Sequence, residues 1–279
     1  MNNIVELMVL YWTTAGVFPG LGEISRFDFK DRVQAAARAG FNGIGIWHTD
    51  LEHILQHRTL KEMKMILDDN GIKHVELEFI TDWFLDGARK AESDYRKKRL
   101  FDASEVLHAK HIKVGDFYNS TCPMSRIIES FAALCTEAEK YGAIIGFEIM
   151  GCAMIDNIKD ALTMVETAGA KNGGLIIDIY QVANLGMTYD EISRIPLEYL
   201  TSVELNDGTL PGSPDHDPSN RTFCGEGDYD IKGFINCVNN MGYIGPWGVE
   251  VISEKLATLP LKELNTRAFN TTIAEFIDY

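Results

Sequence analysis

Short apolar runs that end in polar residues alternate with amphipathic helical segments along the whole chain. The runs lie at Ile4–Trp12, Gly43–Trp47, Lys73–Glu78, His111–Val114, Ile144–Glu148, Leu175–Asp178, Leu200–Glu204 and Gly248–Val251. Apolar residues recur every three or four positions in the segments between them, as in Asp31–Ala39, Leu60–Asn70 and Ile127–Tyr141, which is the spacing of one helix face. Glycine corners precede many strands, because glycine accepts the left-handed conformation that ends a helix; they include Gly40, Gly71, Gly142, Gly173-Gly174 and Gly242.

Eight strand–helix alternations in 279 residues predict the α/β class and a closed (β/α)8 TIM barrel, formed as a single domain over residues 1–279. Successive strand ends fall about 26 to 36 residues apart, and about 46 before the last, which suits one strand–helix unit per step. A doubly wound sheet is the alternative, but no G-x-G-x-x-G follows the first strand to support it. The one long loop, Asp207–Asp230, is of a length typical of functional or mobile segments.

The composition narrows the classes of partner. Forty-one acidic residues against 26 basic ones give a net charge of −15, a field that repels nucleic-acid phosphates and anionic membranes. The five cysteines form no C-x-x-C pair, which argues against a zinc ribbon or a disulfide scaffold. Because no basic signal start and no apolar run of about 20 residues is present, we expect a cytoplasmic protein whose partner is a small molecule, and which is able to form a homo-oligomer.

Four consecutive strands end in a carboxylate, namely in Glu148, Asp178, Glu204 and Glu250. A single such residue is more often solvated, but in a barrel all strand ends meet at one mouth. Two unit charges about 4 Å apart repel by roughly 4 kcal/mol at an effective dielectric near 20. Such a cluster must bind a cation, hold protons or recruit basic neighbours. The all-oxygen set favours Mn2+, or Mg2+, over zinc, with Co2+ and Zn2+ as further options.

Basic side chains near the strand ends are candidates to balance this charge, and each also has a purely structural interpretation. They are His48 after the second strand, Lys113 in the fourth and Arg221 in the long loop. The segment 225–228, Gly-Glu-Gly-Asp, precedes a helix; its amides could cradle an anion, although a tight turn explains it better. Trp12, Trp47, Phe79 and Trp83 lie at or after strand ends and could wall a pocket or simply fill the core.

The chain resembles the sugar-phosphate isomerase/epimerase superfamily of xylose-isomerase-like barrels, also known for an AP endonuclease 2-type fold. The resemblance covers most of the chain and is carried by segments at Gly146–Glu148, Ile177–Gln181, Val203–Gly208, Arg221–Asp228 and Gly242–Glu250. It implies a metal held by glutamate, aspartate, histidine and glutamate on strands five to eight, which maps onto Glu148, Asp178, Glu204 and Glu250. Here Glu204 replaces the histidine, and Gln181 replaces a substrate-facing histidine.

In the epimerase branch of this superfamily two glutamates, here Glu148 and Glu250, exchange a proton on opposite faces of the substrate. The resemblance therefore implies a metal-dependent isomerase or epimerase of a keto sugar or polyol ketone that works through an enediolate. Substrate contacts are assigned to His48, Lys113, Gln181 and Arg221.

Three other interpretations stay open or are set aside. Loss of a leaving group at the same site would make the enzyme a lyase or dehydratase of a 3-keto sugar or inosose, including the catalytic subunit of a C-glycoside-cleaving complex. The two histidine replacements also allow a non-catalytic sugar-binding subunit. DNA repair of the endonuclease IV type is disfavoured, because its histidine positions here hold Gln181, Glu204 and Thr222.

Overall fold

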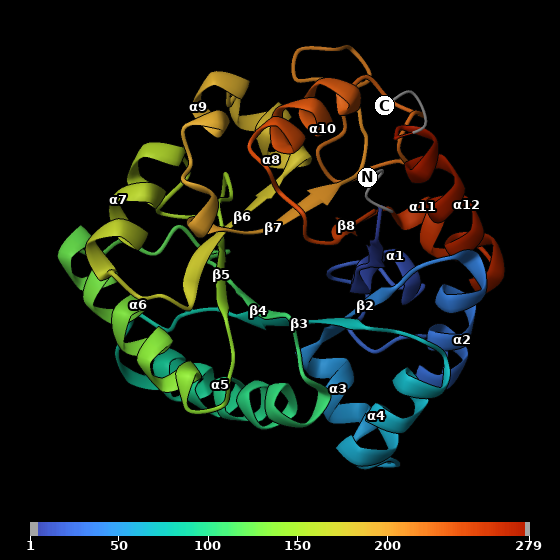
Figure 1. Ribbon diagram of the computed structural model, residues 1–279, viewed down its shortest axis with the longest axis horizontal. Helices are drawn as coiled ribbons and strands as arrows, with labels where there is room; N and C mark the ends of the chain where they lie inside the picture. Colours follow the sequence, from blue (N-terminus) through green and yellow to red (C-terminus); the bar gives the residue numbers. More distant parts are fainter. Residues whose placement is uncertain (1–4, 277–279) are drawn as a thin grey trace.

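Eight parallel strands close into a barrel that is surrounded by helices (Figure 1). The computed structural model describes residues 5–276. Each strand pairs with the next along the chain, and β1 pairs with β8, which confirms the predicted (β/α)8 barrel. The strands are β1 (Leu7–Val9), β2 (Gly43–Trp47), β3 (His74–Ile80), β4 (His111–Val114), β5 (Ile145–Glu148), β6 (Gly173–Asp178), β7 (Leu200–Leu205) and β8 (Trp247–Val249).

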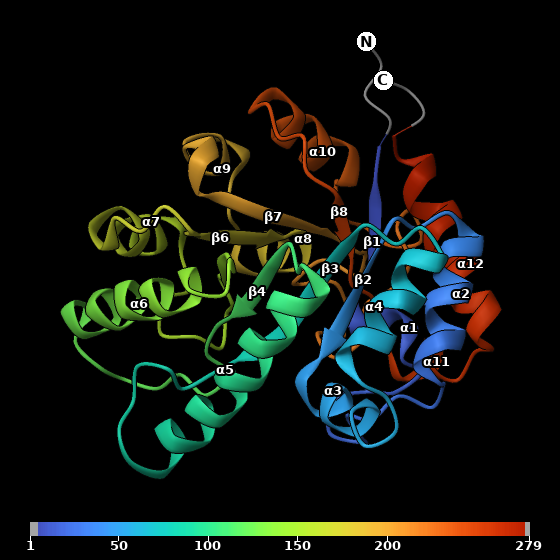
Figure 2. The same ribbon diagram turned by 60° about the horizontal axis from the view of Figure 1, so that its bottom comes forward.

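The helices cover the outside of the barrel, and α12 lies beside α2 so that the ring closes (Figures 1 and 2). They are α1 (Tyr11–Thr14), α2 (Phe29–Ala39), α3 (His48–Ile54), α4 (Leu60–Asp69), α5 (Gly87–Leu107), α6 (Met124–Glu139), α7 (Ile158–Ala168), α8 (Ile179–Leu185), α9 (Tyr189–Ser193), the 3-10 helix η1 (Leu197–Tyr199), α10 (Ile231–Asn240), α11 (Glu254–Ala257) and α12 (Leu261–Ala274). None of these helices combines the length and the apolar composition needed to cross a bilayer.

The first strand is shorter than predicted. It ends at Val9, and Trp12 lies in the short helix α1, while Ile4 is outside the described residues. The chain turns here because the hydroxyl of Thr13 donates to the carbonyl of Val249 (2.8 Å) and accepts from the amide of Val251 (2.7 Å). This contact fixes the chain at the end of β8.

The glycine corners act as predicted in some places and differently in others. Gly40 ends α2 with φ of 117°, which is the left-handed helix stop. The pair Gly173-Gly174 was wrongly predicted to be such a corner, since it begins β6 and α7 ends instead at Gly169, with φ of 61°. A Cβ atom on Gly174 would lie 2.6 Å from the carbonyl oxygen of Tyr199, so glycine allows a close approach of two backbone segments.

The two faces of each strand differ in chemistry. One set of alternate residues is apolar and packs against the helices as the main core; in β3 and β4 this set is Val75, Leu77, Ile112 and Val114. The other set points into the barrel and consists of charged side chains, glycines and a few apolar residues such as Met8 and Ile176. A Cβ atom on Gly45 would lie 2.4 Å from Oε1 of Glu78, so this glycine makes room for a buried carboxyl. The interior of the barrel is therefore built for charge, and the apolar core lies outside it.

Candidate active site

The four strand-end carboxylates converge inside the barrel. One oxygen from each of them lies within 4.8 Å of one from every other, and all four side chains are buried. Glu148 ends β5, Asp178 ends β6 and caps α8, Glu204 lies in β7, and Glu250 follows β8. The register of β6 and β7 pairs Asp178 with Glu204, so these two carboxylates lie side by side on neighbouring strands.

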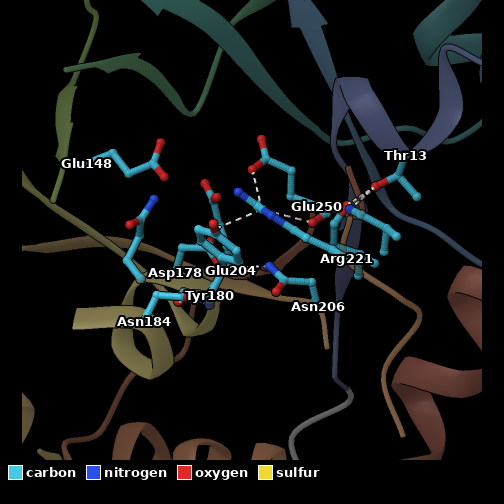
Figure 3. A network of polar contacts seen from close by, with 12 residues as sticks. Thr13, Glu148, Asp178, Tyr180, Asn184, Glu204, Asn206, Arg221 and Glu250 are labelled. Atoms are coloured by element: carbon cyan, nitrogen blue, oxygen red, sulfur yellow. Dashed lines mark hydrogen bonds and ion pairs between the residues drawn. The ribbon is translucent and has the colours of Figure 1, made fainter. Parts of the chain in front are cut away.

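Arg221, from the long loop after β7, reaches into this group (Figure 3). Its Nη1 atom donates to Oδ2 of Asp178 (2.9 Å) and to Oε2 of Glu250 (2.8 Å), and the guanidinium lies 4.3 Å from the ring centre of Tyr180. The other oxygen of Asp178 accepts from the amide of Tyr180 (2.9 Å) and from Nδ2 of Asn206 (2.7 Å). Burial raises the pKa of Asp178, although Arg221 opposes the rise. Both oxygens of Asp178 are thus fixed in place by the protein.

Lys113 lies deeper in the barrel and is completely buried. Its ammonium nitrogen lies within 4.0 Å of carboxylate oxygens of five residues, which are Glu204 (2.8 Å), Glu250 (3.2 Å), Glu76 (3.3 Å), Glu148 (3.8 Å) and Glu78 (4.0 Å). An ammonium with these neighbours serves to balance buried charge.

Glu76 and Glu78 extend the acidic group beyond the four residues found from the sequence. Burial alone would raise the pKa of Glu76, but the charges of Lys113 and His111 lower it to about 2, and Glu76 contacts the ring of His111. Burial raises the pKa of Glu78 well above its usual value. The strand 74–80 alternates charged and apolar residues, a signal that could have found both glutamates.

The two glutamates of the predicted acid/base pair differ in their ionisation. Burial raises the pKa of Glu148 to about 8, despite the opposing charge of Lys113. For Glu250 burial has the same effect, but Lys113 and Arg221 outweigh it and hold its pKa below the usual value. Burial also raises the pKa of Glu204 well above normal. Of the predicted pair, Glu148 therefore favours the acid form and Glu250 the base form.

The donor set fits a divalent cation. Oε1 of Glu204 pairs with the ammonium of Lys113 (2.8 Å), but Oε2 is buried and accepts no hydrogen bond within the described residues. Lys113 at 3.8 Å is the only described ion-pair partner of Glu148. Buried carboxylates without donors are costly unless a cation meets them. With Asp178 and Glu250 the four offer only oxygen ligands, which hard cations such as Mn2+ and Mg2+ prefer.

Of the other predicted residues, Gln181 lies on α8, which follows β6, and His48 on α3, which follows β2. The side-chain oxygen of Gln181 accepts from the amide of Gly151 (3.2 Å), just after β5. His48 begins α3 and lines a cavity of about 200 Å3 between α3 and α5; burial lowers its pKa to about 4. No described hydrogen bond or ion pair joins His48 to the four carboxylates. The sequence does not show which way the side chain of His48 points after the end of β2.

The amides of the segment 225–229 do bind an anion, but it belongs to the chain itself. The carboxylate of Asp207 accepts from the amides of Gly225 (2.9 Å), Gly227 (2.9 Å), Tyr229 (3.0 Å) and Gly208 (2.8 Å). Asp207 also pairs with Thr222 through a backbone bridge, directly beside Arg221. This anchor fixes the loop that carries Arg221 into the site.

A second apolar cluster, separate from the main core, lies at the ends of the early strands. It contains Tyr11, Trp12, Ala15, Trp47, Phe79, Met150 and Ala153. The rings of Trp12 and Trp47 lie 5.0 Å apart, and those of Trp47 and Phe79 6.1 Å apart. Trp83, by contrast, packs on Phe131 in the outer core. The strand ends thus offer an acidic side from β5–β8 and an aromatic side from β1–β3.

A profile of the xylose isomerase-like TIM barrel family matches residues 33–269. The chain belongs to this family. Among solved structures, that of the IolI protein with a bound zinc atom is similar to this chain. The two superpose with a TM-score of 0.83 at 18% identity, over 99% of each chain. This likeness confirms the xylose isomerase-like fold.

Two curated relatives of this xylose isomerase-like chain are enzymes. It is 24% identical over 240 residues to a 3-dehydroshikimate dehydratase of Pseudomonas aeruginosa, a match that covers 83% of this chain and 37% of that protein. It is 21% identical over 248 residues to an inosose isomerase of Halalkalibacterium halodurans, covering 84% of this chain and 86% of that one. The chain therefore spans little more than a third of the dehydratase and most of the isomerase.

Proposed function

We propose that this protein is a divalent-metal-dependent isomerase or epimerase of a keto sugar or polyol ketone. The observation that carries the proposal is the convergence of four buried carboxylates within 4.8 Å of one another. The inosose isomerase relative supports the substrate class, because it matches over most of its own length. The substrate would be a small carbohydrate, with Gln181 and Arg221 as contacts.

Glu148, Asp178, Glu204 and Glu250 would hold the metal, for which Mn2+ is the best fit to the oxygen donors. The zinc of the IolI relative makes Zn2+ the competitor to test. When bound, a divalent ion supplies Lewis acidity that stabilises the negative charge of an enediolate.

The proton transfers fall to Glu250 and Glu148. The pKa of Glu250 lies below the usual value, so its carboxylate suits removal of the proton next to the ketone. Glu148, whose pKa is about 8 in the metal-free site, holds a proton more readily than Glu250 and would return one to the substrate. Neighbouring carboxyls whose pKa values are driven apart indicate such a division of roles. Delivery to the opposite face of the carbon inverts the centre.

Elimination is the second candidate, and the dehydratase relative favours it. The same base would remove the proton, and Glu148 would instead protonate a departing hydroxyl or aglycone. The two outcomes share every residue named above and differ only in where the second proton goes.

Incubation of the purified protein with keto sugars, inososes and 3-dehydroshikimate in D2O tests both. Deuterium incorporation without loss of a leaving group indicates isomerisation, whereas loss of water indicates dehydration. Both should stop with EDTA, return with Mn2+, and be absent in the Glu148→Gln/Glu250→Gln variant. Turnover that survives EDTA and this double substitution would refute the proposal.

A further inference from the structure

The interior of the barrel holds more carboxyl groups than Arg221 contacts. Six carboxyl groups face one another there, which are Glu76, Glu78, Glu148, Asp178, Glu204 and Glu250. Arg221 contacts only Asp178 and Glu250 among them. The deeper half of the group, around Glu76 and Glu78, therefore needs a cation of its own.

Lys113 meets this need from the centre of the group. Its ammonium lies 2.8 Å from Oε1 of Glu204 and 3.3 Å from Oε1 of Glu76. It is 0% exposed, so no substrate reaches it without a rearrangement of the strands. A permanent positive charge surrounded by five carboxylates occupies the position that a metal ion would take in an oxygen-lined cavity.

Glu204 lies between the deeper carboxyl groups around Glu76 and the outer ones that Arg221 contacts. Its Oε1 pairs with the ammonium of Lys113, while Oε2 lies buried with no hydrogen-bond donor in the described part of the chain. One oxygen is therefore committed to the fixed cation, and the other is available to a bound one. Glu250 is shared in the same way, with Oε1 on Lys113 at 3.2 Å and Oε2 on Arg221 at 2.8 Å.

We propose that Lys113 is a built-in second cation, which fills an inner cation position bounded by Glu76, Glu78 and Glu204 and limits the barrel to one divalent ion. This inference rests on the proposed metal site and states how many divalent ions the barrel can bind. Lys113 is thus a positioning residue that holds Glu204 and Glu250, and it acts through them.

Removal of the ammonium should open the inner position. The test compares Mn2+ bound per chain, by elemental analysis after dialysis and by titration calorimetry, in the wild type and in Lys113→Met. The expected result is one additional Mn2+ ion per chain in the variant, with a spin-coupled pair in its electron paramagnetic resonance spectrum. Lys110→Met is the matched control: Lys110 lies just before the same strand, donates to the carbonyl of Thr201, and its loss should leave the count unchanged.

The difference in Mn2+ ions per chain between variant and wild type tests the role of Lys113. The number of ions in the wild type tests the proposed metal site. A wild type without metal and a variant with one ion would refute the metal-dependent function but would still support the assignment of Lys113 to an inner cation position. An equal count, or loss of binding in folded Lys113→Met, would overturn the inference. Folding of the variant only in the presence of Mn2+ would support it, since the ion then replaces the ammonium. If the variant does not fold under any condition, the electron paramagnetic resonance spectrum of the wild type with Mn2+ is the test. A spin-coupled Mn2+ pair would contradict the proposal, and a single uncoupled ion would support it.

Discussion

Metal binding should be strongly coupled to pH, because Glu148, one of the proposed ligands, has a pKa of about 8. A metal binds the ionised carboxylate, so the proton must leave first. At pH 8 about half of the Glu148 side chains are ionised, and at pH 6 only about one in a hundred is. The apparent affinity for Mn2+ should therefore fall about 50-fold from pH 8 to pH 6, which is ~2.3 kcal/mol. The raised pKa of Glu204 acts in the same direction and makes this a lower bound.

Titration calorimetry at pH 6, 7 and 8, in pairs of buffers with different ionisation enthalpies, measures both the affinity and the protons released. Glu148→Gln should bind more weakly and release about one proton fewer at pH 7. Glu254→Gln, an exposed change near the same end of the barrel, should behave as the wild type. A dissociation constant that stays constant from pH 6 to pH 8, with no proton release, would refute the reasoning.

Three further predictions follow from single contacts. Gly45→Ala places a methyl group against the carboxyl of Glu78, and it should lower the free energy of unfolding by about 1–3 kcal/mol; an unchanged thermal midpoint would show that the strand yields without cost. Asp207→Ala removes the acceptor of four amides and should cost about 2–4 kcal/mol, with faster hydrogen exchange at residues 225–229; retained protection there would contradict the loop anchor. Glu250→Gln should slow deuterium exchange of a substrate by at least about 100-fold while near-ultraviolet circular dichroism shows an intact fold; exchange at the wild-type rate would remove Glu250 from the role of base.

The barrel was predictable from the sequence because its signal is local and repeated. Each strand is a short apolar run, and the boundaries of β2 and β4 agree with the prediction. The failures also have local causes: Trp12 follows β1 without a break in hydrophobicity but lies in a helix. Glycine at 173 and 174 serves close packing of backbones and not a helix end. Composition alone does not separate these two uses of glycine.

The site was predictable in part, because strand ends are visible in the sequence but the directions of side chains are not. Four carboxylates at equivalent strand ends predicted the cluster that the structure brings together. Two further glutamates were missed: Glu76 lies within a strand, and Glu78, although it ended the predicted third strand, was not grouped with the four carboxylates of the later strands. The contact of Arg221 with Asp178 depends on a long loop held by Asp207, and its path is set by tertiary contacts that no local pattern encodes.

A crystal structure of the protein grown with Mn2+, with data collected at the manganese absorption edge, would show whether the four carboxylates bind a metal ion. We expect an anomalous peak inside the barrel, from an ion bound by carboxylate oxygens of Glu148, Asp178, Glu204 and Glu250. A barrel interior without such a peak at millimolar Mn2+, or an ion bound only by other residues, would contradict the proposed metal site.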